Sequence, residues 1–354
     1  MKIIEIFASQ TWGGGEQYVF DLSRRLLKDN HFVFFAGKKS EAVERRLAAI
    51  GQPFCRLPLG WYFGAASIWK LAKLVRKEKV EVIHVHHFKA AFVAVAVKLL
   101  SHRKIKVMLT RHLVRKGKNN LLYRFLYRHI DHIIFVSNLA KQKFLSVQPA
   151  LSPDKIAVIF NSIYAEEREK TVFENTNAAL VIGFCGRLEK EKGVEILLQA
   201  IALCKNKNIK CLIAGNGTLE AEIKQISQNG GNIQYVGFQE NIQKFIAQTD
   251  IGVTPSLVEE AFGLANLEFM MQGKPVITTS NGAQPEYITH NKNGILIEPN
   301  NPQALAYYID YLTENPEKRM ELGKNALQTF EEELNYEIFY EKMLKIITNA
   351  VIPA

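Results

Sequence analysis

The residues with the clearest capacity for chemistry lie at 255–277, in the stretch PSLVEEAFGLANLEFMMQGKPVI. A helix is expected to begin near Gly263, which places Glu260 in the preceding loop and Glu268 about one and a half turns inside the helix. Backbone N–H groups at a helix start lack partners within the helix and stabilise an anion such as a diphosphate. The two carboxylates can accept hydrogen bonds from hydroxyls of a sugar and a ribose. The alternative is that Glu260 and Glu268 have no ligand and only interact favourably with the positive N-terminal end of a solvent-exposed helix.

A cationic loop, GRLEKEKG at 186–193, directly follows an apolar run at 179–185. Ligands of open α/β sheets bind beyond the carboxyl ends of the strands, so Arg187 and Lys192 are expected where a phosphate would lie. Arginine pairs with phosphate oxygens through two parallel hydrogen bonds, and lysine supplies a point charge. The alternative for this loop is a solvated run of alternating charge.

The sequence argues against a metal ion. It contains six aspartates but no D-x-D, the pattern that would hold a divalent cation against a diphosphate. We therefore expect a metal-independent reaction in which Arg187, Lys192 and helix N–H groups neutralise a leaving diphosphate. The cysteines form no C-x-x-C pair and are expected to be reduced core residues: Cys55, Cys185, Cys204 and Cys211.

A glycine-rich loop and a group of histidines are the corresponding features of the first half. Gly13, Gly14 and Gly15 follow the first expected strand, so the N–H groups after them can meet an anion or a sugar. The spacing is not the G-x-G-x-x-G of dinucleotide sites, and a tight structural turn is the alternative. Histidines gather at strand ends: His84, His86, His87 and His112. A structural role is the usual one for a single histidine, but His112 is well placed for chemistry at a carboxyl end.

Short β-branched runs alternate with amphipathic stretches along all 354 residues. This alternation predicts parallel strands joined by right-handed crossovers, and the length suits two doubly wound α/β domains. The expected strands are 2–7, 32–36, 81–85, 105–110 and 132–136 in the first half, and 179–185, 209–214, 233–236, 250–253 and 274–279 in the second. A polar segment at 161–177 is the expected connection, which gives domains at 1–163 and 164–334.

The net charge of +10 is distributed unevenly. Residues 1–165 hold 28 Lys and Arg against 10 Asp and Glu, whereas the remainder holds 17 against 25. A domain this basic attracts polyanions. Nucleic acid, an anionic membrane surface and a phosphorylated acceptor are the candidates.

Two segments of the basic half, 61–79 and 111–128, interleave aromatic and basic residues. This composition favours docking at the headgroup layer of a membrane, and the alternative for Ile68, Leu71 and Val75 is the core face of an amphipathic helix. No apolar run is long enough to span a bilayer, and the N-terminus turns polar too early for a signal peptide. We expect a cytoplasmic protein that attaches peripherally to the inner face of the cytoplasmic membrane.

These motifs, in this order, resemble those of the retaining GT-B glycosyltransferases of family 4 (glycosyl transferases group 1), of the bacterial lipopolysaccharide and polysaccharide type. The loop ending in Glu16 is similar to that family's GG-x-E, and VEVIHVHH and TRH to its histidine-bearing strands. GRLEKEKG resembles its phosphate-contact motif, AGNGTLEAEI the strand and turn after it, and EEAFGLANLE its E(x7)E signature. The likeness covers nearly the whole chain.

The resemblance implies residue roles as well as a fold. Arg187 and Lys192 would bind the donor diphosphate. Glu260 would contact hydroxyls of the transferred sugar, and Glu268 the nucleotide ribose. His112 would contact the donor sugar or the acceptor. Further contacts, largely through the backbone, would come from Gly14, Gly15, Gly215, Phe262, Gly263 and Leu264.

The implied fold has two Rossmann-like domains facing a deep cleft, with a last helix at 335–354 that crosses back onto the first domain. The implied reaction moves a hexose or N-acetylhexosamine from a nucleotide sugar, expected to be a UDP-sugar, to a lipid-linked, lipopolysaccharide or polysaccharide acceptor, without a cofactor. Two alternatives stay open, a nucleotide-sugar epimerase on the same fold and a non-catalytic scaffold subunit. Nucleic-acid binding has only the charge in its favour and is not expected. Asn161-Ser162 and Gly282-Ala283 depart from the family's usual Asn-Gly and Gly-Gly, and are expected to alter loop conformation.

Overall fold

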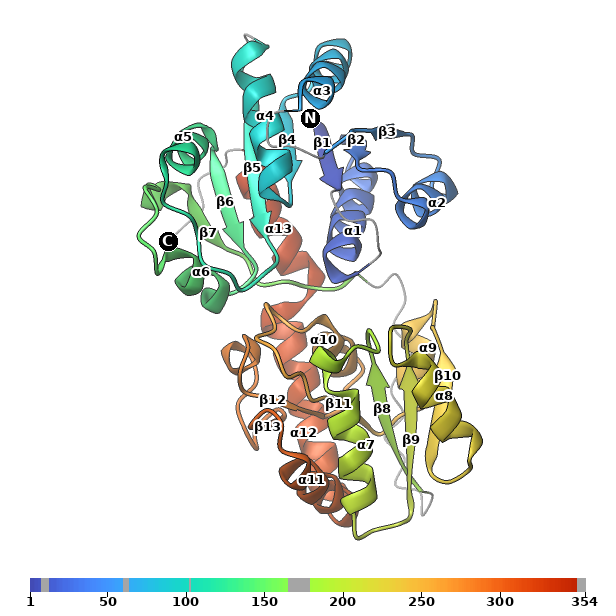
Figure 1. Ribbon diagram of the computed structural model, residues 1–354. Helices are drawn as coiled ribbons and strands as arrows, with labels where there is room; N and C mark the ends of the chain where they lie inside the picture. The colour runs from blue at the N-terminus through green and yellow to red at the C-terminus, as the bar shows by residue number, and fades with distance from the viewer. Residues whose placement is uncertain (8–12, 60–63, 102, 165–178, 349–354) are drawn as a thin grey trace. The chain divides into compact units, whose positions relative to one another are not determined.

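The computed structural model describes residues 1–7, 13–59, 64–101, 103–164 and 179–348 (Figure 1). The chain forms two compact units, one of residues 1–161 with 336–354 and one of residues 162–335. Most of the expected connection at 161–177, and residues 61–63 of the first aromatic and basic segment, lie outside the described residues. No described helix has both the length and the apolarity needed to cross a bilayer.

The first unit is built on a parallel sheet of order β3-β2-β1-β4-β5-β6-β7. Its strands are β1 Lys2–Phe7, β2 Phe32–Gly37, β3 Phe54–Arg56, β4 Val82–Val85, β5 Lys106–Arg111, β6 His132–Phe135 and β7 Ile156–Val158. The five predicted strands are confirmed within one residue at each end. The additional strands, β3 and β7, are three-residue edge strands without a buried apolar run that could have revealed them.

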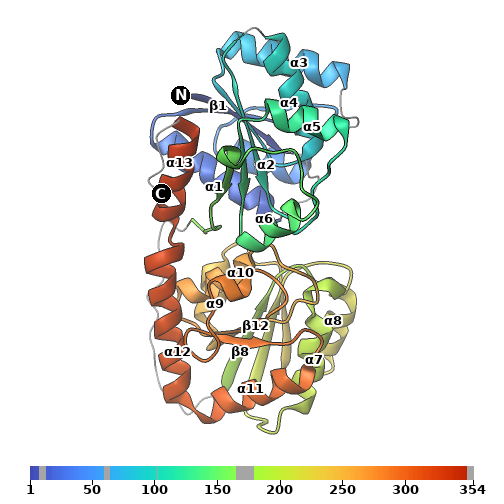
Figure 2. The same ribbon diagram turned by 90° about the vertical axis from the view of Figure 1, so that its left-hand side faces the viewer.

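Helices cover both faces of this sheet, as a doubly wound fold requires (Figure 2). They are α1 Gly14–Lys28, α2 Glu41–Ala49, α3 Ala65–Glu78, α4 Phe88–Leu100, α5 Leu121–His129, α6 Asn138–Leu145 and α13 Tyr336–Thr348. Helix α4 is buried along most of its length because α3 and α5 pack on either side of it. In α3, Leu71 and Val75 are fully buried and Ile68 packs against the same core, which confirms the amphipathic-helix interpretation for these three residues.

The last helix of the chain, α13, packs on the first unit beside α1. The ring of Tyr18 lies edge-on to Phe339, with ring centroids 5.2 Å apart, and its hydroxyl donates to the sulfur of Met343 at 3.3 Å. The ammonium of Lys106 donates to the carbonyl oxygen of Ile346 at 2.7 Å, near the end of α13. A cation near a helix C-terminus is favourable because the final carbonyls carry partial negative charge.

The second unit has a parallel sheet of order β10-β9-β8-β11-β12-β13. Its strands are β8 Leu180–Cys185, β9 Ile209–Ala214, β10 Ile233–Gly237, β11 Ile251–Thr254, β12 Val276–Thr279 and β13 Ile295–Ile297. Its helices are α7 Val194–Leu203, α8 Glu220–Gln228, α9 Ile242–Ala247, α10 Leu264–Met271, α11 Pro302–Glu314 and α12 Pro316–Thr329. The five predicted strands are confirmed within two residues, and the three-residue β13 is additional.

The strand order reverses once in each sheet, between β1 and β4 and between β8 and β11. At such a point the two chain segments leave toward opposite faces of the sheet, which opens a crevice beyond the carboxyl ends of the two strands. The loops that follow these four strands are therefore where a ligand site is expected. The prediction of two doubly wound α/β domains is confirmed.

We expect Phe339→Ala to destabilise the first unit by about 3 kcal/mol, because it removes a buried aromatic ring between α13 and α1. Trp12, Trp61 and Trp69 are the only tryptophans of the sequence, so tryptophan fluorescence during urea unfolding reports the first unit selectively. Tyr307→Ala, at an exposed aromatic residue of the second unit, is the control. Equal unfolding midpoints for Phe339→Ala and the wild type would show that α13 does not stabilise this unit.

Candidate functional site

Three loops meet at the carboxyl edge of the second sheet. The hydroxyl of Ser256, in the loop after β11, donates to the carbonyl oxygen of Glu191 in the loop after β8 at 3.1 Å, and the N–H of Leu257 donates to the same oxygen at 2.9 Å. The N–H of Ala283, after β12, donates to the carbonyl oxygen of Glu260 at 2.9 Å. Because all three contacts involve backbone atoms, they set the spacing between the loops whatever the charged side chains do.

Two glycines make this approach possible. Gly193, the N-cap of α7, has φ of 73°, and a Cβ there would lie 1.8 Å from the carbonyl oxygen of Pro255. Any other residue would push the loops apart. Gly263, the N-cap of α10, has φ of 84°, a left-handed conformation that most side chains disfavour. Leu264 is the first residue of α10, so its N–H is among those for which the helix offers no carbonyl partner.

The charged side chains that the sequence singled out are partly brought together here. The ammonium of Lys192 lies 2.6 Å from a carboxylate oxygen of Glu260, and the hydroxyl oxygen of Ser256 lies 2.9 Å from the same oxygen. Arg187 instead pairs with Glu191 at 2.5 Å, and its side chain is 57% exposed. Lys192 and Glu260 thus form the centre of the cluster, while Arg187 lies at the outer edge of the same loop.

Glu268 lies in the second turn of α10 and is partly buried. The thiol of Cys185, at the end of β8, is 3.8 Å from its carboxylate. Burial and this negative charge raise the pKa of the Cys185 thiol. Glu268 therefore points toward the carboxyl end of β8, which excludes the alternative of a glutamate on a solvated helix face.

A buried polar network holds the start of α10 in place. The hydroxyl of Tyr287 donates to the carbonyl oxygen of Phe262 at 2.6 Å and accepts from the amide of Asn266 at 3.0 Å. The amide oxygen of Asn266 in turn accepts from the hydroxyl of Thr254 at 2.5 Å. Asn266 and Tyr287 were missed by sequence reasoning. An asparagine on the apolar side of a helix was the available signal, since a buried amide requires partners.

Gly215, the remaining sequence candidate of this unit, lies in the loop after β9. Its carbonyl oxygen accepts from the hydroxyl of Tyr235 at 3.0 Å, and its N–H donates to the carbonyl of Gly237. The loops after β8 and β9 approach closely, because a Cβ on Gly215 would lie 1.8 Å from the carbonyl oxygen of Gly186. Gly215 thus lies beside the start of the cationic loop.

A buried carboxylate organises the histidines of the first unit. Glu5, in the middle of β1, is fully buried, and its two oxygens lie 3.0 Å from Nδ1 of His84 and 3.0 Å from Nε2 of His86. Nε2 of His84 is 2.7 Å from the hydroxyl of Thr110, and Nδ1 of His86 is 3.0 Å from Nε2 of His112. Five side chains, from β1, from β4 and the residue after it, and from the end of β5, thus form one continuous network.

The pattern of partners assigns the protons in this network. An ionised Glu5 accepts from both His84 and His86, so His86 must accept from Nε2–H of His112, which leaves Nδ1 of His112 as a bare acceptor. Burial lowers the pKa of His86 and lowers that of His112 to about 3, and nearby positive charge adds to both effects. Burial raises the pKa of Glu5, an effect that His84 opposes. At neutral pH His112 is therefore uncharged and suited to accept a hydrogen bond.

The glycine-rich loop meets this network at His112. A Cβ on Gly15 would lie 3.9 Å from the His112 ring, and the ring of Tyr18 is edge-on to it at 4.7 Å. Gly14 is the first residue of α1, on the adjoining turn. Glu5 escaped sequence reasoning, although a glutamate inside the apolar run KIIEIF was a usable signal, because a strand buried on both faces tolerates a charge only with partners.

Glu5, His84 and His86 also have the composition of a metal site, since their ligand atoms all lie within 4.8 Å of one another. Each of these atoms already has a partner: the two nitrogens face the two carboxylate oxygens. Glu5, His84 and His86 are thus already joined to one another by hydrogen bonds.

Comparison with known protein families shows which family has this sequence pattern. The model described as Glycosyltransferase Family 4 matches residues 12–167, and that described as Glycosyl transferases group 1 matches residues 165–329. Together they cover most of both units and both candidate clusters apart from Glu5. The chain belongs to the glycosyltransferases of family 4. Its two Rossmann-like domains form the GT-B fold.

Relatives of this glycosyltransferase include enzymes of surface polysaccharide assembly. The capsular polysaccharide biosynthesis glycosyltransferase CapM of Staphylococcus aureus is 24% identical over 344 residues, which is 90% of each chain. An uncharacterized glycosyltransferase of Methanocaldococcus jannaschii is 28% identical over 275 residues, 70% of each chain. The crystal structure of Anabaena HepE in complex with UDP superposes with a TM-score of 0.82 at 18% identity, covering 99% of this chain and 100% of HepE.

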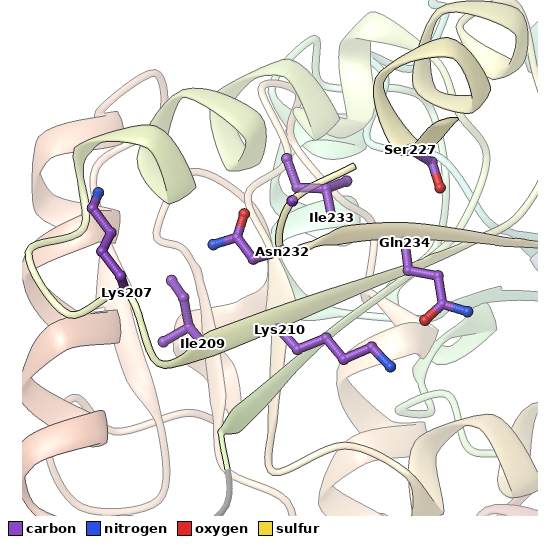
Figure 3. Close-up of a pocket in the computed structure, with 8 residues that line it drawn as sticks. Lys207, Ile209, Lys210, Ser227, Asn232, Ile233 and Gln234 are labelled. Atoms are coloured by element: carbon purple, nitrogen blue, oxygen red, sulfur yellow. The ribbon is translucent and has the colours of Figure 1, made fainter. Parts of the chain in front are cut away.

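A hollow of about 570 Å³ lies at the amino ends of strands in the second sheet, opposite to the ends that carry the candidate site (Figure 3). It is lined near the starts of β9 and β10 by residues that include Lys207, Lys210 and Asn232. None of the glycosyltransferase's candidate site residues contributes to it. The exposed lysines of this hollow therefore offer controls for charge changes at the candidate site, which lies at the carboxyl ends of the strands.

We expect the first unit to lose stability on mild acidification. The unfolded chain binds protons at its histidines near pH 6.5, whereas folded His86 and His112 take them up only at much lower pH. The stabilisation is therefore present above pH 6.5 and is lost as the pH falls, by about 1 to 2 kcal/mol for His112 near pH 5, and the lowered pKa of His86 acts in the same direction. Glu5, whose folded pKa is raised, acts in the opposite sense but is a single group. Urea unfolding followed by tryptophan fluorescence measures the effect.

Two variants make this pH dependence specific. His112→Gln removes one of the titrating groups, so its unfolding free energy should fall less steeply between pH 7 and pH 5 than that of the wild type. His290→Gln, at an exposed histidine of the second unit, should retain the wild-type slope. A slope in His112→Gln equal to that of the wild type would contradict the assignment of His112 as a buried neutral group.

Proposed function

We propose that this glycosyltransferase is a retaining hexosyltransferase that moves a sugar from a UDP-sugar to a lipid-linked, lipopolysaccharide or polysaccharide acceptor, without a metal ion. The observation that carries the proposal is the pair of Lys192 and Glu260, held beside the start of α10 where the strand order of the second sheet reverses. HepE, which shares the fold, has been crystallised with UDP and with UDP-glucose. CapM supports a polysaccharide product.

The donor diphosphate would bind between the cationic loop and the N-terminus of α10. In the structure Lys192 and Glu260 neutralise each other. An incoming UDP-sugar offers phosphate oxygens to Lys192 and sugar hydroxyls to Glu260, so each side chain exchanges one partner for another and neither is left unpaired. Arg187 is exposed on the same loop and can turn from Glu191 to the diphosphate. Glu268 would accept from the ribose hydroxyls, and backbone atoms of Gly215, Phe262, Gly263 and Leu264 would complete the donor site.

A retaining reaction of the following kind needs no protein base. The bond from the anomeric carbon to the phosphate oxygen breaks, the acceptor oxygen attacks from the same face, and the acceptor proton passes to the departing phosphate oxygen. Cations and helix N–H groups then stabilise the charge that develops on the diphosphate, the role that a divalent ion has in other transferases. His112, neutral and with a bare Nδ1, would orient a hydroxyl of the donor sugar or acceptor, beside Gly14 and Gly15.

We expect Lys192→Gln and Arg187→Gln each to weaken UDP-glucose binding by about tenfold, because each removes one charge-assisted contact to the diphosphate. Isothermal titration calorimetry on the full chain measures this. Lys210→Gln, which makes the same charge change in the hollow at the opposite sheet edge, is the matched control and should bind like the wild type. Unchanged affinity in an Arg187→Gln, Lys192→Gln double variant would remove the basis of the donor site.

Turnover assays distinguish the candidate activities. The full chain is incubated with UDP-glucose and a membrane lipid extract, and the anomeric configuration of the product is read by NMR. An α-linked glucose supports retention, and an inverted product refutes it. Conversion of the UDP-sugar without any acceptor would favour the epimerase alternative. No UDP release from any common UDP-sugar, with unchanged behaviour of the double variant, would favour the scaffold alternative.

We also propose that the first unit attaches to an anionic membrane surface. Apolar side chains are exposed on and before α5, with Leu121 83%, Leu113 45% and Phe125 41% exposed. Basic side chains accompany them: Lys116, Lys118, Arg124 and Arg128. Interfacial attachment typically combines apolar side chains inserted at the acyl boundary with cations at the lipid headgroups. The excess of basic residues in the first unit adds to the attraction for an anionic surface.

Replacing Leu121 and Phe125 together by asparagine is expected to lower binding to vesicles containing anionic lipid by about tenfold, because it removes the apolar part of the contact. Co-sedimentation with such vesicles, and with vesicles of zwitterionic lipid alone, measures it. Tyr307→Asn, at an aromatic residue that is 63% exposed in the second unit, is the control. Undiminished sedimentation of the double variant would exclude α5 as the attachment surface.

A further inference from the structure

Arg111, the last residue of β5, carries a buried guanidinium group without an acidic partner. The residue is only 7% exposed, and its Nε is buried without a hydrogen-bond partner. Within the described part of the chain no carboxylate forms an ion pair with it. Buried charges in proteins are ordinarily paired, so this group is unusual.

The guanidinium lies against the beginning of α4. Its central carbon is 4.5 Å from the centroid of the Phe88 ring and 5.9 Å from that of Phe144. Phe88 is the first residue of α4, a helix of 13 residues whose first turn contains no acidic residue and whose N-cap, His87, provides no side-chain hydrogen bond. The partial positive charge of a helix N-terminus therefore lies beside the buried cation, an arrangement that is unfavourable unless an anion joins it.

Further positive charge surrounds this place. Burial lowers the pKa of Arg111 to about 10, and the positive charge of Arg115 contributes to the shift. Burial lowers the pKa of His87, and the positive charge of Arg111 adds to this effect. The groups that oppose these charges are the phenols of Tyr123 and Tyr127, and burial raises the pKa of Tyr127 to about 12, so it is neutral under ordinary conditions. The positive potential is thus left without a compensating anion from the described residues.

We propose that Arg111, Arg115 and the N-terminus of α4 form a site for a phosphate group carried by the acceptor substrate. The planar fork of an arginine and the N–H groups of a helix start are both suited to a tetrahedral oxyanion. The proposal rests on the function proposed above. It adds that the acceptor is anionic and that its phosphate binds in the first unit, apart from the donor diphosphate assigned to Lys192.

The position relative to His112 supports an acceptor role. Arg111 and His112 are successive residues at the carboxyl end of β5, and such side chains point to opposite faces of a sheet. The geometry agrees: Arg111 contacts Phe88 on the α4 side, whereas His112 contacts Tyr18 on the α1 side. A phosphate held by Arg111 would thus lie at the same carboxyl end of β5 as His112 but on the other face of the sheet, so an acceptor that reaches both residues passes over the end of the strand.

Phosphate titration of the full chain tests the site directly. Isothermal titration with inorganic phosphate at constant ionic strength should show binding that Arg115→Gln weakens by about tenfold. Arg115 is exposed, so this variant is not expected to disturb folding. Arg111→Met, which keeps the aliphatic stem over Phe88, should abolish binding, with tryptophan fluorescence as the check on folding. Arg45→Gln, an equal charge change at an exposed residue of α2, should leave binding unchanged. Wild-type affinity in Arg115→Gln and Arg111→Met would overturn the proposal.

A second comparison separates this site from the donor site and from one for free phosphate. The Arg187→Gln, Lys192→Gln double variant should retain binding that depends on Arg111 and Arg115, and loss of all phosphate binding in it would overturn the proposal. Glycerol 1-phosphate, a phosphomonoester, should bind at least as tightly as inorganic phosphate if the group belongs to an acceptor. Its exclusion would overturn the acceptor assignment.

Kinetics distinguish failure of this proposal from failure of the proposed function. With a phosphorylated acceptor, Arg115→Gln should raise the acceptor KM several-fold while the KM for UDP-glucose stays unchanged. A change confined to the UDP-glucose KM would contradict the proposal and leave the transferase activity standing. Absence of transfer in the wild type would instead refute the proposed function, while phosphate binding lost in Arg111→Met would still establish an anion site.

Discussion

The reversal of strand order, between β1 and β4 in one sheet and between β8 and β11 in the other, is the constraint on which both candidate clusters depend. It sends neighbouring crossovers to opposite faces of the sheet, so the carboxyl ends of these strands are not covered by their own helices. Polar side chains placed there can meet a ligand without leaving an apolar core. The Lys192 and Glu260 pair, the glycine-rich loop and the histidines all follow strands beside such a point.

The two units use this place in different ways. In the second unit the charged groups are partly exposed and held by backbone contacts between loops, such as the close approach of Gly193 to Pro255, so they can exchange partners with an anionic ligand. In the first unit the titratable groups are buried, and Glu5 fixes the protons of the histidines up to His112. The second unit therefore offers charged side chains that can change partners while backbone contacts keep the spacing of the loops. The other offers a neutral histidine in a fixed orientation, with the buried cation of Arg111 on the opposite face of the same strand.

Much of the fold could be predicted from hydrophobic pattern because the central strands are buried on both faces and read as apolar runs. The strands that escaped prediction, β3, β7 and β13, are three residues long and lie at sheet edges, so each gives an apolar run too short to be recognised. In the site, Glu260 and Lys192 were predicted from helix and loop signals, and the structure brings them into contact. Arg187 is on the predicted loop, but its observed partner is its own neighbour Glu191.

The sequence by itself determined the class of fold, the positions of the central strands, and the residue types at the carboxyl ends of the strands, because these depend on local pattern and chain direction. Only the tertiary structure decided which groups are partners. The contacts of Glu5 with His84 and His86, and of Tyr287 with Phe262, join residues 79, 81 and 25 positions apart in the chain. The lack of an acidic partner for Arg111 among the described residues is likewise a property of the packed interior. No local signal reports such pairings, since the burial that makes them obligatory arises only when the elements pack.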